Sequence, residues 1–320
     1  MAASAPTPAG PQDLPERTDV KGVQAAYHDW EAASYDDKFG ISWDPHVTDY
    51  AADRFRRGLG DRPVPGRVLE LGAGTGFFAV NLVKAGLLDG DLVCSDLSPG
   101  MLEVCARNAA ANDVAITTQV ADAEDLPFPD GSFDVVVGHA VLHHLPVPGL
   151  AIREAFRVLR PGGVLLVAGE PTYWGERVTT IVKRATWRAF RAVTAVPALE
   201  HLRRVDGPAD DVDAALAALE HEVDLHTFHP DEVERMASVA GFTDVTVATE
   251  ELVANWWGWG IRTVEGSMRA DAVGTRWAMT AFRGYRALTR LDEAVLAHVV
   301  PRGLFYNLVL SARRPTAPPD

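Results

Sequence analysis

A glycine-rich turn carries the strongest chemical signal in this sequence. It reads Glu70-Leu-Gly72-Ala-Gly74-Thr-Gly76 and lies between an apolar run and a helical pattern. Glycines allow the backbone to turn sharply and to approach a ligand closely. The turn is not the dinucleotide-binding fingerprint, because that pattern requires a glycine where this chain has Phe77. Taken alone, the segment could equally be an ordinary glycine-rich turn.

Two acidic positions follow at the spacing of a nucleoside site. Asp96 ends the second apolar run, about 20 residues past the glycine turn, where a carboxylate can accept both ribose hydroxyls. Asp122 and Ala123 follow the third run, where an acid can accept the adenine amino group. The alternatives are a helix cap for Asp96 and a turn residue for Asp122. Met101, on the intervening helix, either packs against the purine or belongs to the core.

The elements that position these residues alternate between strand and helix patterns, which predicts an α/β fold with a mostly parallel, seven-stranded sheet and helices on both faces. We expect strands at 67–71, 92–95, 115–120, 133–138, 164–168, 245–248 and 305–311. We expect helices at 77–85, 99–111, 150–159 and 230–240, with Ser98 and Pro99 starting the second and the Pro-Gly-Gly at 161–163 stopping the third.

The remaining sequence divides the chain into further segments. Two long, mostly helical insertions interrupt the alternation, and insertions of this kind often lie over the carboxyl ends of strands, where ligands bind. The expected segments are a disordered tail at 1–20, helices at 21–64, a cofactor-binding core at 65–171, a helical cap insertion at 172–224, a core helix and strand at 225–250, an aromatic-rich helical cap insertion at 251–302, the last core strand at 303–314 and a disordered tail at 315–320.

Four runs of the sequence together resemble a known family. They are VLELGAGTGFFAVNLVKAG, CSDLSPGMLEVCARNA, ADAEDLPFPDGSFDVVVGHAVLHHL and REAFRVLRPGGVLLVAGEP. Their order and spacing resemble class I S-adenosylmethionine-dependent methyltransferases, in the type 11 branch that includes quinone-biosynthesis and natural-product enzymes. The resemblance covers residues 65–171 and implies a Rossmann-like core with S-adenosylmethionine as cofactor.

The same resemblance implies a role for each matching position. Glu70 would lie near the methionyl amino group, and Gly72, Gly74 and Gly76 would line the methionyl and ribose portion. Asp96 would bind the ribose, Asp122 and Ala123 the adenine, and His139 would border the reactive methyl group. The segment at 27–37 resembles the N-terminal helix of the family, and its Tyr35 is our candidate for a further cofactor contact.

Three side chains near the expected cofactor site could act on a methyl acceptor. His143 and His144 follow the fourth strand, and Glu170 follows the fifth. One histidine could be a general base oriented by Glu170, since the unperturbed pKa of histidine lies near neutrality. Alternatively, the pair is a structural turn of the family, or His139, His143 and Glu170 bind a metal. No further strong ligand supports that last interpretation, so we assign no metal.

Charge and composition exclude several other classes of protein. The formal net charge of −14 repels phosphate backbones, so we expect no nucleic-acid partner. The cysteines, Cys94 and Cys105, are too few for a disulfide framework and fit a cytoplasmic protein. The N-terminal residues lack the pattern of a signal peptide, and no apolar run approaches the roughly 20 residues of a membrane span.

The two insertions suggest what the acceptor is like. Residues 177–199 form a basic amphipathic pattern that can lie weakly on an anionic membrane or receive an acidic substrate; alternatively it is a solvated face paired with the acidic stretch at 206–213. Trp256, Trp257 and Trp259 either line an aromatic pocket or form the core of the cap.

We therefore expect methylation of an oxygen or carbon atom of a small-molecule acceptor that is bulky and hydrophobic. The alternatives are a regulatory or scaffold protein that binds the cofactor without catalysis, and another transferase with a nucleoside cofactor. The sequence indicates no oligomeric state.

Overall fold

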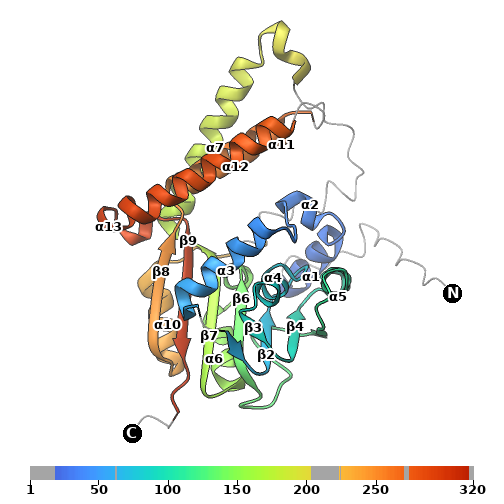
Figure 1. Ribbon diagram of the computed structural model, residues 1–320, viewed down its shortest axis with the longest axis vertical. Coiled ribbons are helices and arrows are strands. Elements are labelled where there is room, and N and C mark those ends of the chain that lie inside the picture. The colour runs from blue at the N-terminus through green and yellow to red at the C-terminus, as the bar shows by residue number, and fades with distance from the viewer. Residues whose placement is uncertain (1–18, 62, 203–222, 224, 270–273, 317–320) are drawn as a thin grey trace, which may run out of the picture.

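A computed structural model describes residues 19–61, 63–202, 223, 225–269 and 274–316. The fold is α/β, as predicted, with a seven-stranded sheet and a group of helices that projects from one end of it (Figure 1). Most of the expected tails at 1–20 and 315–320 and the acidic stretch at 206–213 lie outside the described residues. The first tail ends earlier than predicted, because α1 begins at Val20 with Asp19 as its N-cap.

The strand order in the sheet is β5-β4-β2-β6-β7-β9-β8, and only β9 runs antiparallel to its neighbours. The order reverses between β2 and β6, and in open α/β sheets ligands bind at the carboxyl ends of the strands beside such a reversal. The strands are β2 (Val68–Leu71), β4 (Leu92–Asp96), β5 (Thr117–Val120), β6 (Phe133–His139), β7 (Leu159–Pro171), β8 (Thr243–Glu250) and β9 (Asn307–Arg313). A separate parallel pair, β1 (Val64–Pro65) and β3 (Leu88–Asp89), was not predicted.

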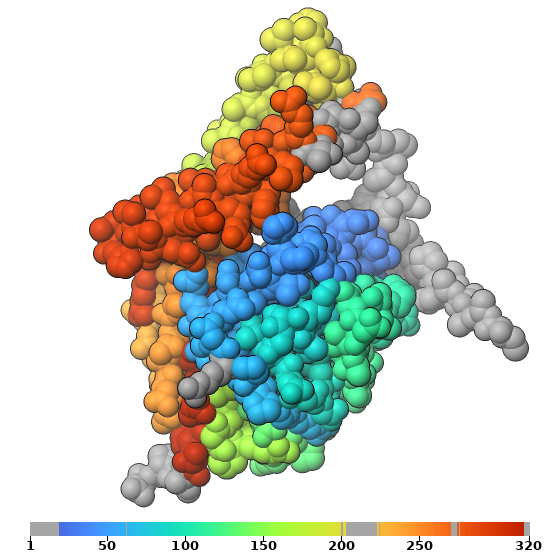
Figure 2. All heavy atoms as spheres, viewed as in Figure 1, coloured from blue at the N-terminus to red at the C-terminus, as the bar shows by residue number. Residues whose placement is uncertain are grey.

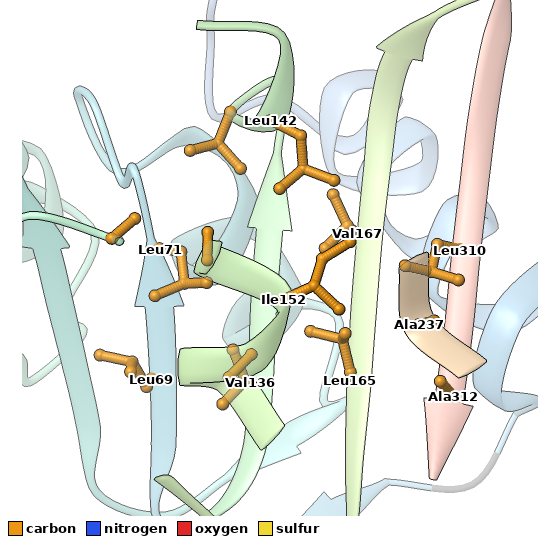
Figure 3. Packing of buried hydrophobic residues seen from close by; sticks show 14 of the residues in the cluster. Leu69, Leu71, Val136, Leu142, Ile152, Leu165, Val167, Ala237, Leu310 and Ala312 are labelled. Atoms are coloured by element: carbon orange, nitrogen blue, oxygen red, sulfur yellow. The ribbon is translucent and has the colours of Figure 1, made fainter. Parts of the chain in front are cut away.

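Helices cover both faces of the sheet because apolar side chains of the strands point alternately to one face and the other. Leu69 and Leu71 pack on the face that carries Ile152, as Figure 3 shows, whereas Val68 packs on the opposite face against Phe55 and Phe78. The first face carries α6 (Pro148–Val158) and α10 (Pro230–Ala240), and the second carries α3 (Pro45–Leu59), α4 (Phe77–Lys84) and α5 (Pro99–Ala111).

Local capping explains where several helices begin and end. The Ser98 side chain accepts a hydrogen bond from the Met101 amide at 3.0 Å, and Pro99 occupies the first helical position of α5. Gly241 ends α10 in the left-handed conformation. The predicted bounds of these two helices are confirmed.

The Pro-Gly-Gly at 161–163 does not stop the third predicted helix. Helix α6 ends earlier, at Val158, and the three residues lie within β7, where the pairing register with β6 shifts between Phe133 and Val135. A side chain at Gly163 would come within 3.0 Å of the backbone oxygens of Arg160 and Asp134. The glycine therefore serves a close strand–strand approach rather than a helix end.

The N-terminal segment at 27–37 is not one helix. It is divided between α1 (Val20–Glu31) and α2 (Tyr35–Phe39). The chain turns back after α1 so that Lys38 Nζ lies 2.5 Å from the buried Glu31 carboxylate. The prediction was wrong because the chain turns at 32–34, and this turn brings Lys38 back to Glu31.

The projecting helices, which we call the cap, come from both insertions (Figure 1). Helix α7 packs on α11, and α11 packs on α12. The cap consists of α7 (Tyr173–Val193), a 3-10 helix (Pro197–Leu202), α11 (Val253–Ser267), α12 (Thr275–Leu291), the π-helical turn η5 (Asp292–Leu296) and α13 (Ala297–Val299). Within the described ranges, no helix is both long and apolar enough to cross a membrane.

Candidate active site

A cavity of about 1780 Å³ lies between the carboxyl edge of the sheet, the N-terminal helices and the cap. The opening between the cap and the N-terminal helices is visible in Figure 2. The cavity exceeds the roughly 300–1,000 Å³ typical of a small-ligand pocket. Of the predicted site residues, only Gly76 and Glu170 do not line it, and both lie directly behind residues that do. The structure therefore brings the predicted site together in one place.

The three loop glycines serve different purposes. All three have a positive φ, which disfavours other residues. A Cβ on Gly72 would lie 2.4 Å from the Val141 side chain, and one on Gly76 would lie 2.9 Å from Cys105 Sγ. A Cβ on Gly74 would meet nothing within 4 Å. Gly74 therefore leaves open space where a cofactor can approach the backbone.

Asp96 fixes the glycine loop to the end of β4. Its Oδ2 accepts a hydrogen bond from the Gly74 amide at 2.8 Å, and its Oδ1 accepts one from the Ser98 amide at 2.9 Å. Each carboxylate oxygen retains a second lone pair, so the group can still accept ribose hydroxyls. Burial raises the pKa of Asp96.

Glu70 lies at the end of β2 with its side chain on the α4 side of the sheet. It is 1% exposed, and its Oε1 accepts a hydrogen bond from the Ala79 amide at 3.1 Å. Burial, with a smaller contribution from Asp96, raises the pKa of Glu70 to about 8. A bound ammonium group would favour the charged form of this carboxyl group, so the position fits a methionyl amino group.

Asp122 is paired with a lysine that the sequence analysis did not single out. Lys21 Nζ of α1 lies 2.5 Å from Asp122 and 2.7 Å from Glu124. The carboxylate and Ala123 both line the cavity. An adenine amino group would therefore share Asp122 with this lysine. No local pattern indicates the pair, because its members lie 101 residues apart.

Tyr35 and Met101 form an apolar wall of the cavity. Met101 is 2% exposed and packs with Ala32 and Val104, with Tyr35 lying against the same cluster. Burial, together with the charges of Glu31 and Asp96, raises the pKa of Tyr35, so its hydroxyl stays protonated.

The first helices contribute a second group of polar residues that the sequence analysis missed. The Tyr27 hydroxyl donates to Glu31 at 3.1 Å, and Lys38 Nζ lies 2.5 Å from the same carboxylate. Burial opposes ionisation of Glu31, but hydrogen bonds from His28 and Lys38 outweigh it and lower the pKa of the carboxyl group. All four residues except Lys38 line the cavity.

His139 ends β6 at the centre of the cavity. Its ring lies among the aromatic rings of Phe77, Phe78 and Tyr50, and burial lowers its pKa to about 3, so it is neutral. Its buried Nε2 has no hydrogen-bond partner among the described residues. A Cβ on Gly169 would lie 2.7 Å from that nitrogen, so the glycine makes room for the ring.

Glu170 holds His143 in one orientation. Its carboxylate is fully buried and accepts hydrogen bonds from the amides of Val141 and Leu142 at 2.8 Å and of His143 at 3.1 Å. The same carboxylate lies 2.8 Å from Nδ1 of the His143 ring. A proton on Nδ1 makes Nε2 the acceptor nitrogen of the ring, which is the atom that a general base would use.

His144 has a different environment. Its Nδ1 lies 3.0 Å from the Val223 carbonyl oxygen, and burial lowers its pKa well below the usual value. It is not oriented by Glu170, so the two histidines are not equivalent. The described residues contain no group of three side chains that could hold a metal ion, so the metal interpretation gains no support.

The cap adds further aromatic side chains to the lining of the cavity. Trp257 and Trp259 line it, whereas Trp256 does not. Lys183 Nζ lies over the Trp259 ring at 3.6 Å, and Trp257 Nε1 donates to the Ala281 carbonyl oxygen at 2.9 Å. Two of the three predicted tryptophans therefore face the cavity.

A buried ion-pair cluster, the Arg54 cluster, lies where α3 meets the cap. Arg54 Nη2 lies 2.7 Å from Glu250 and 2.6 Å from Glu251. Tyr285 of α12 and Asn307 of β9 both donate hydrogen bonds to Glu251, at 2.5 and 2.9 Å. The sequence analysis missed this cluster because its members come from separate elements.

Comparison with known proteins agrees with this description. Residues 69–167 match the family model described as "Methyltransferase domain". A demethylmenaquinone methyltransferase of Symbiobacterium thermophilum is 32% identical over 182 residues, covering 55% of this chain and 68% of that protein. A 2-methyl-6-phytyl-1,4-hydroquinone methyltransferase of Oryza sativa is 39% identical over 113 residues, but the match spans only 33% of its length and 35% of this chain.

A solved structure extends the likeness of the fold beyond the matched segment. Phosphoethanolamine N-methyltransferase 2 of Haemonchus contortus, in complex with S-adenosylhomocysteine, has a TM-score of 0.58 at 16% identity, covering 94% of this chain and 61% of that one. The fold and the site thus define a Rossmann-like protein that binds a nucleoside cofactor. The chain belongs to the S-adenosylmethionine-dependent methyltransferase family, and S-adenosylmethionine is its cofactor.

Proposed function

We propose that the protein methylates an oxygen or carbon atom of a small, hydrophobic, quinol-like acceptor. The observation that carries this proposal is the Glu170–His143 pair, which borders the same cavity as the Gly74 loop and Asp96. Such an arrangement places a potential base beside a cofactor site. The buried, free cysteines fit the reducing cytoplasm that we propose as its location.

In this proposal, each group of residues has a separate task. S-adenosylmethionine supplies an electrophilic methyl carbon when it is bound. Glu70, Asp96 and Asp122 hold and orient it, and residues of the cap line the far side of the cavity, where the acceptor would bind. His143 Nε2 takes the proton that the acceptor loses, and Glu170 stabilises the positive charge that then forms on the ring.

The acceptor class rests on the lining of the cavity and on the relatives. The aromatic rings of Phe77, Trp257, Trp259 and Phe282 face the cavity and suit an apolar ring system. The relatives named above are a demethylmenaquinone and a hydroquinone methyltransferase. A quinol hydroxyl also has a proton for His143 to remove, whether the methyl group goes to oxygen or to the adjacent ring carbon.

The test is methyl transfer from labelled S-adenosylmethionine to a short-tailed demethylnaphthoquinol. We expect a labelled product with the wild-type protein. His143→Ala should lower kcat by roughly 10²–10⁴, the usual contribution of a general base, without changing cofactor affinity. The matched control is His298→Ala, which removes an exposed histidine of α13.

The possible outcomes separate the parts of the proposal. Wild-type turnover in His143→Ala would refute the base assignment. Tight cofactor binding with no labelled product from any quinol, phenol or acid acceptor would favour the non-catalytic alternative.

A further inference from the structure

The side of α7 that faces away from α11 carries an unusual combination of exposed residues. Ile181 is 67% exposed, Trp174 is 50% exposed and Trp187 is 45% exposed. Isolated apolar residues are normal on a protein surface, but these share one stripe of a single helix with exposed arginines. We call this the outer stripe; it consists of Trp174, Arg177, Ile181, Arg184, Trp187 and Arg188.

Helical geometry explains how these residues come to share a stripe. Successive members from Trp174 through Arg177, Ile181 and Arg184 to Arg188 are three or four positions apart, so their side chains lie side by side along the helix surface. Trp187 is three positions from Arg184 and lies at the edge of the stripe. The opposite side of α7, with Gly175 and Thr179, is buried and packs on α11. In Figures 1 and 2 the helix extends well beyond the sheet, at the top of the view.

The charge of α7 contrasts with that of the whole chain. The protein has a formal net charge of −14, yet Glu176 is the only acidic residue of this helix. Its basic residues are Arg177, Lys183, Arg184, Arg188 and Arg191. A helix with arginines and tryptophans on one stripe complements an anionic lipid surface, because the indole rings enter the headgroup region while the guanidinium groups meet phosphates.

The cavity reaches the same helix along one edge of the outer stripe. Glu176, Thr180 and Lys183 of α7 line the cavity. Arg184 both lines the cavity and is exposed on the outer stripe. The edge of the cavity therefore adjoins the outer stripe, and an acceptor dissolved in a bilayer would have a short path into it.

We propose that the outer stripe of α7 docks the protein on the surface of an anionic lipid bilayer. The docking depends on this stripe alone. Only its purpose, the delivery of a hydrophobic acceptor, rests on the function proposed above.

The test is co-sedimentation of the full-length protein with vesicles. One set contains phosphatidylcholine with 30% phosphatidylglycerol, and the other contains phosphatidylcholine alone. We expect at least tenfold tighter binding to the anionic vesicles, weakened by added salt. The triple variant R177Q/R184Q/R188Q should lose at least tenfold in affinity, since each basic residue near the surface contributes about a factor of five. Ile181→Ser should weaken binding as well.

The matched control is R107Q/R153Q/R235Q, which removes the same charge from exposed positions on α5, α6 and α10. Its binding to vesicles should equal that of the wild type. If both triple variants lose the same vesicle affinity, the binding depends only on net charge and not on the outer stripe. That result would overturn the proposal. Self-association of the wild-type protein that Ile181→Ser abolishes would also overturn the proposal, because a second copy of the chain would then cover the stripe.

Thermal unfolding should give the wild-type midpoint for every variant, which verifies the fold independently of cofactor affinity, because Arg184 lines the cavity. The vesicle assay contains no acceptor, so absence of methyl transfer would not affect it.

Discussion

At the scale of single residues, burial controls the charge of ionisable groups that line the cavity. Glu70 is protonated near neutral pH because its folded-state pKa of about 8 lies above the usual 4.5. Between these two values the folded state binds one more proton than the unfolded chain, so the free energy of unfolding must fall as the pH rises.

Glu70→Gln should remove this dependence. In the absence of cofactor, the variant should gain stability relative to the wild type as the pH rises from 5 to 8, by about 1.4 kcal/mol per pH unit at most. Urea unfolding of both proteins across this range measures the difference. Asp96 is present in both, so it serves as the internal control. A stability difference that does not change with pH would contradict the assigned protonation of Glu70.

Many residues of the candidate site could be predicted from the sequence because they sit at fixed offsets from strand ends. Glu70, Asp96 and His139 are the clearest cases, and the structure places all three on the cavity. Lys21 could not be predicted, because its partner Asp122 lies 101 residues away in the sequence. Glu31 could not be predicted, because its pairing with Lys38 forms only once the chain turns between α1 and α2.

At the scale of elements, the loop between β2 and α4 determines how closely a ligand can approach. Gly74→Ala should lower stability by about 1–2 kcal/mol through its positive φ and should weaken cofactor binding more than tenfold, because the new methyl group fills the open space beside Asp96.

Gly86→Ala provides the matched control. Gly86 has a φ of +69°, and a Cβ at this position would meet nothing within 4 Å, but the residue lies at the far end of α4 and does not line the cavity. Thermal unfolding should show similar losses for the two variants, and calorimetry should show weakened cofactor binding for Gly74→Ala alone. Equal cofactor affinity in both variants would contradict the claim that the glycine loop contacts the cofactor.

Elements with local signals could be predicted from the sequence almost to the residue. Capping by Ser98 and termination by Gly241 define α5 and α10 without reference to the rest of the fold. The break between α1 and α2 depends on Lys38 reaching Glu31, and the end of α6 depends on how β7 pairs with β6. Such contacts form only in the folded chain, so local patterns do not reveal them.

At the scale of the whole molecule, the Arg54 cluster joins the core to the cap. Burial raises the pKa of Glu250, and the guanidinium of Arg54 opposes that rise. Arg54→Met should lower the free energy of unfolding by about 3 kcal/mol, because the buried Glu251 loses its cation and Glu250 keeps only Arg57.

Arg56→Met is the comparison variant. Arg56 pairs with Asp53 and Asp61 at the surface, so its loss should change stability by less than about 0.5 kcal/mol. Chemical denaturation distinguishes the two variants. Equal stability of both would mean that the cluster does not hold the cap to the core.

The central claim is that the glycine loop, Asp96 and Asp122 bind one adenosyl ligand together. Calorimetric titration of the purified protein with S-adenosylhomocysteine tests it most directly. We predict one site per chain with a Kd well below millimolar, and a loss of roughly 10- to 100-fold in Asp96→Ala, the usual effect of removing hydrogen bonds to a charged group. No heat of binding at millimolar ligand, or an unchanged affinity in Asp96→Ala, would contradict the account.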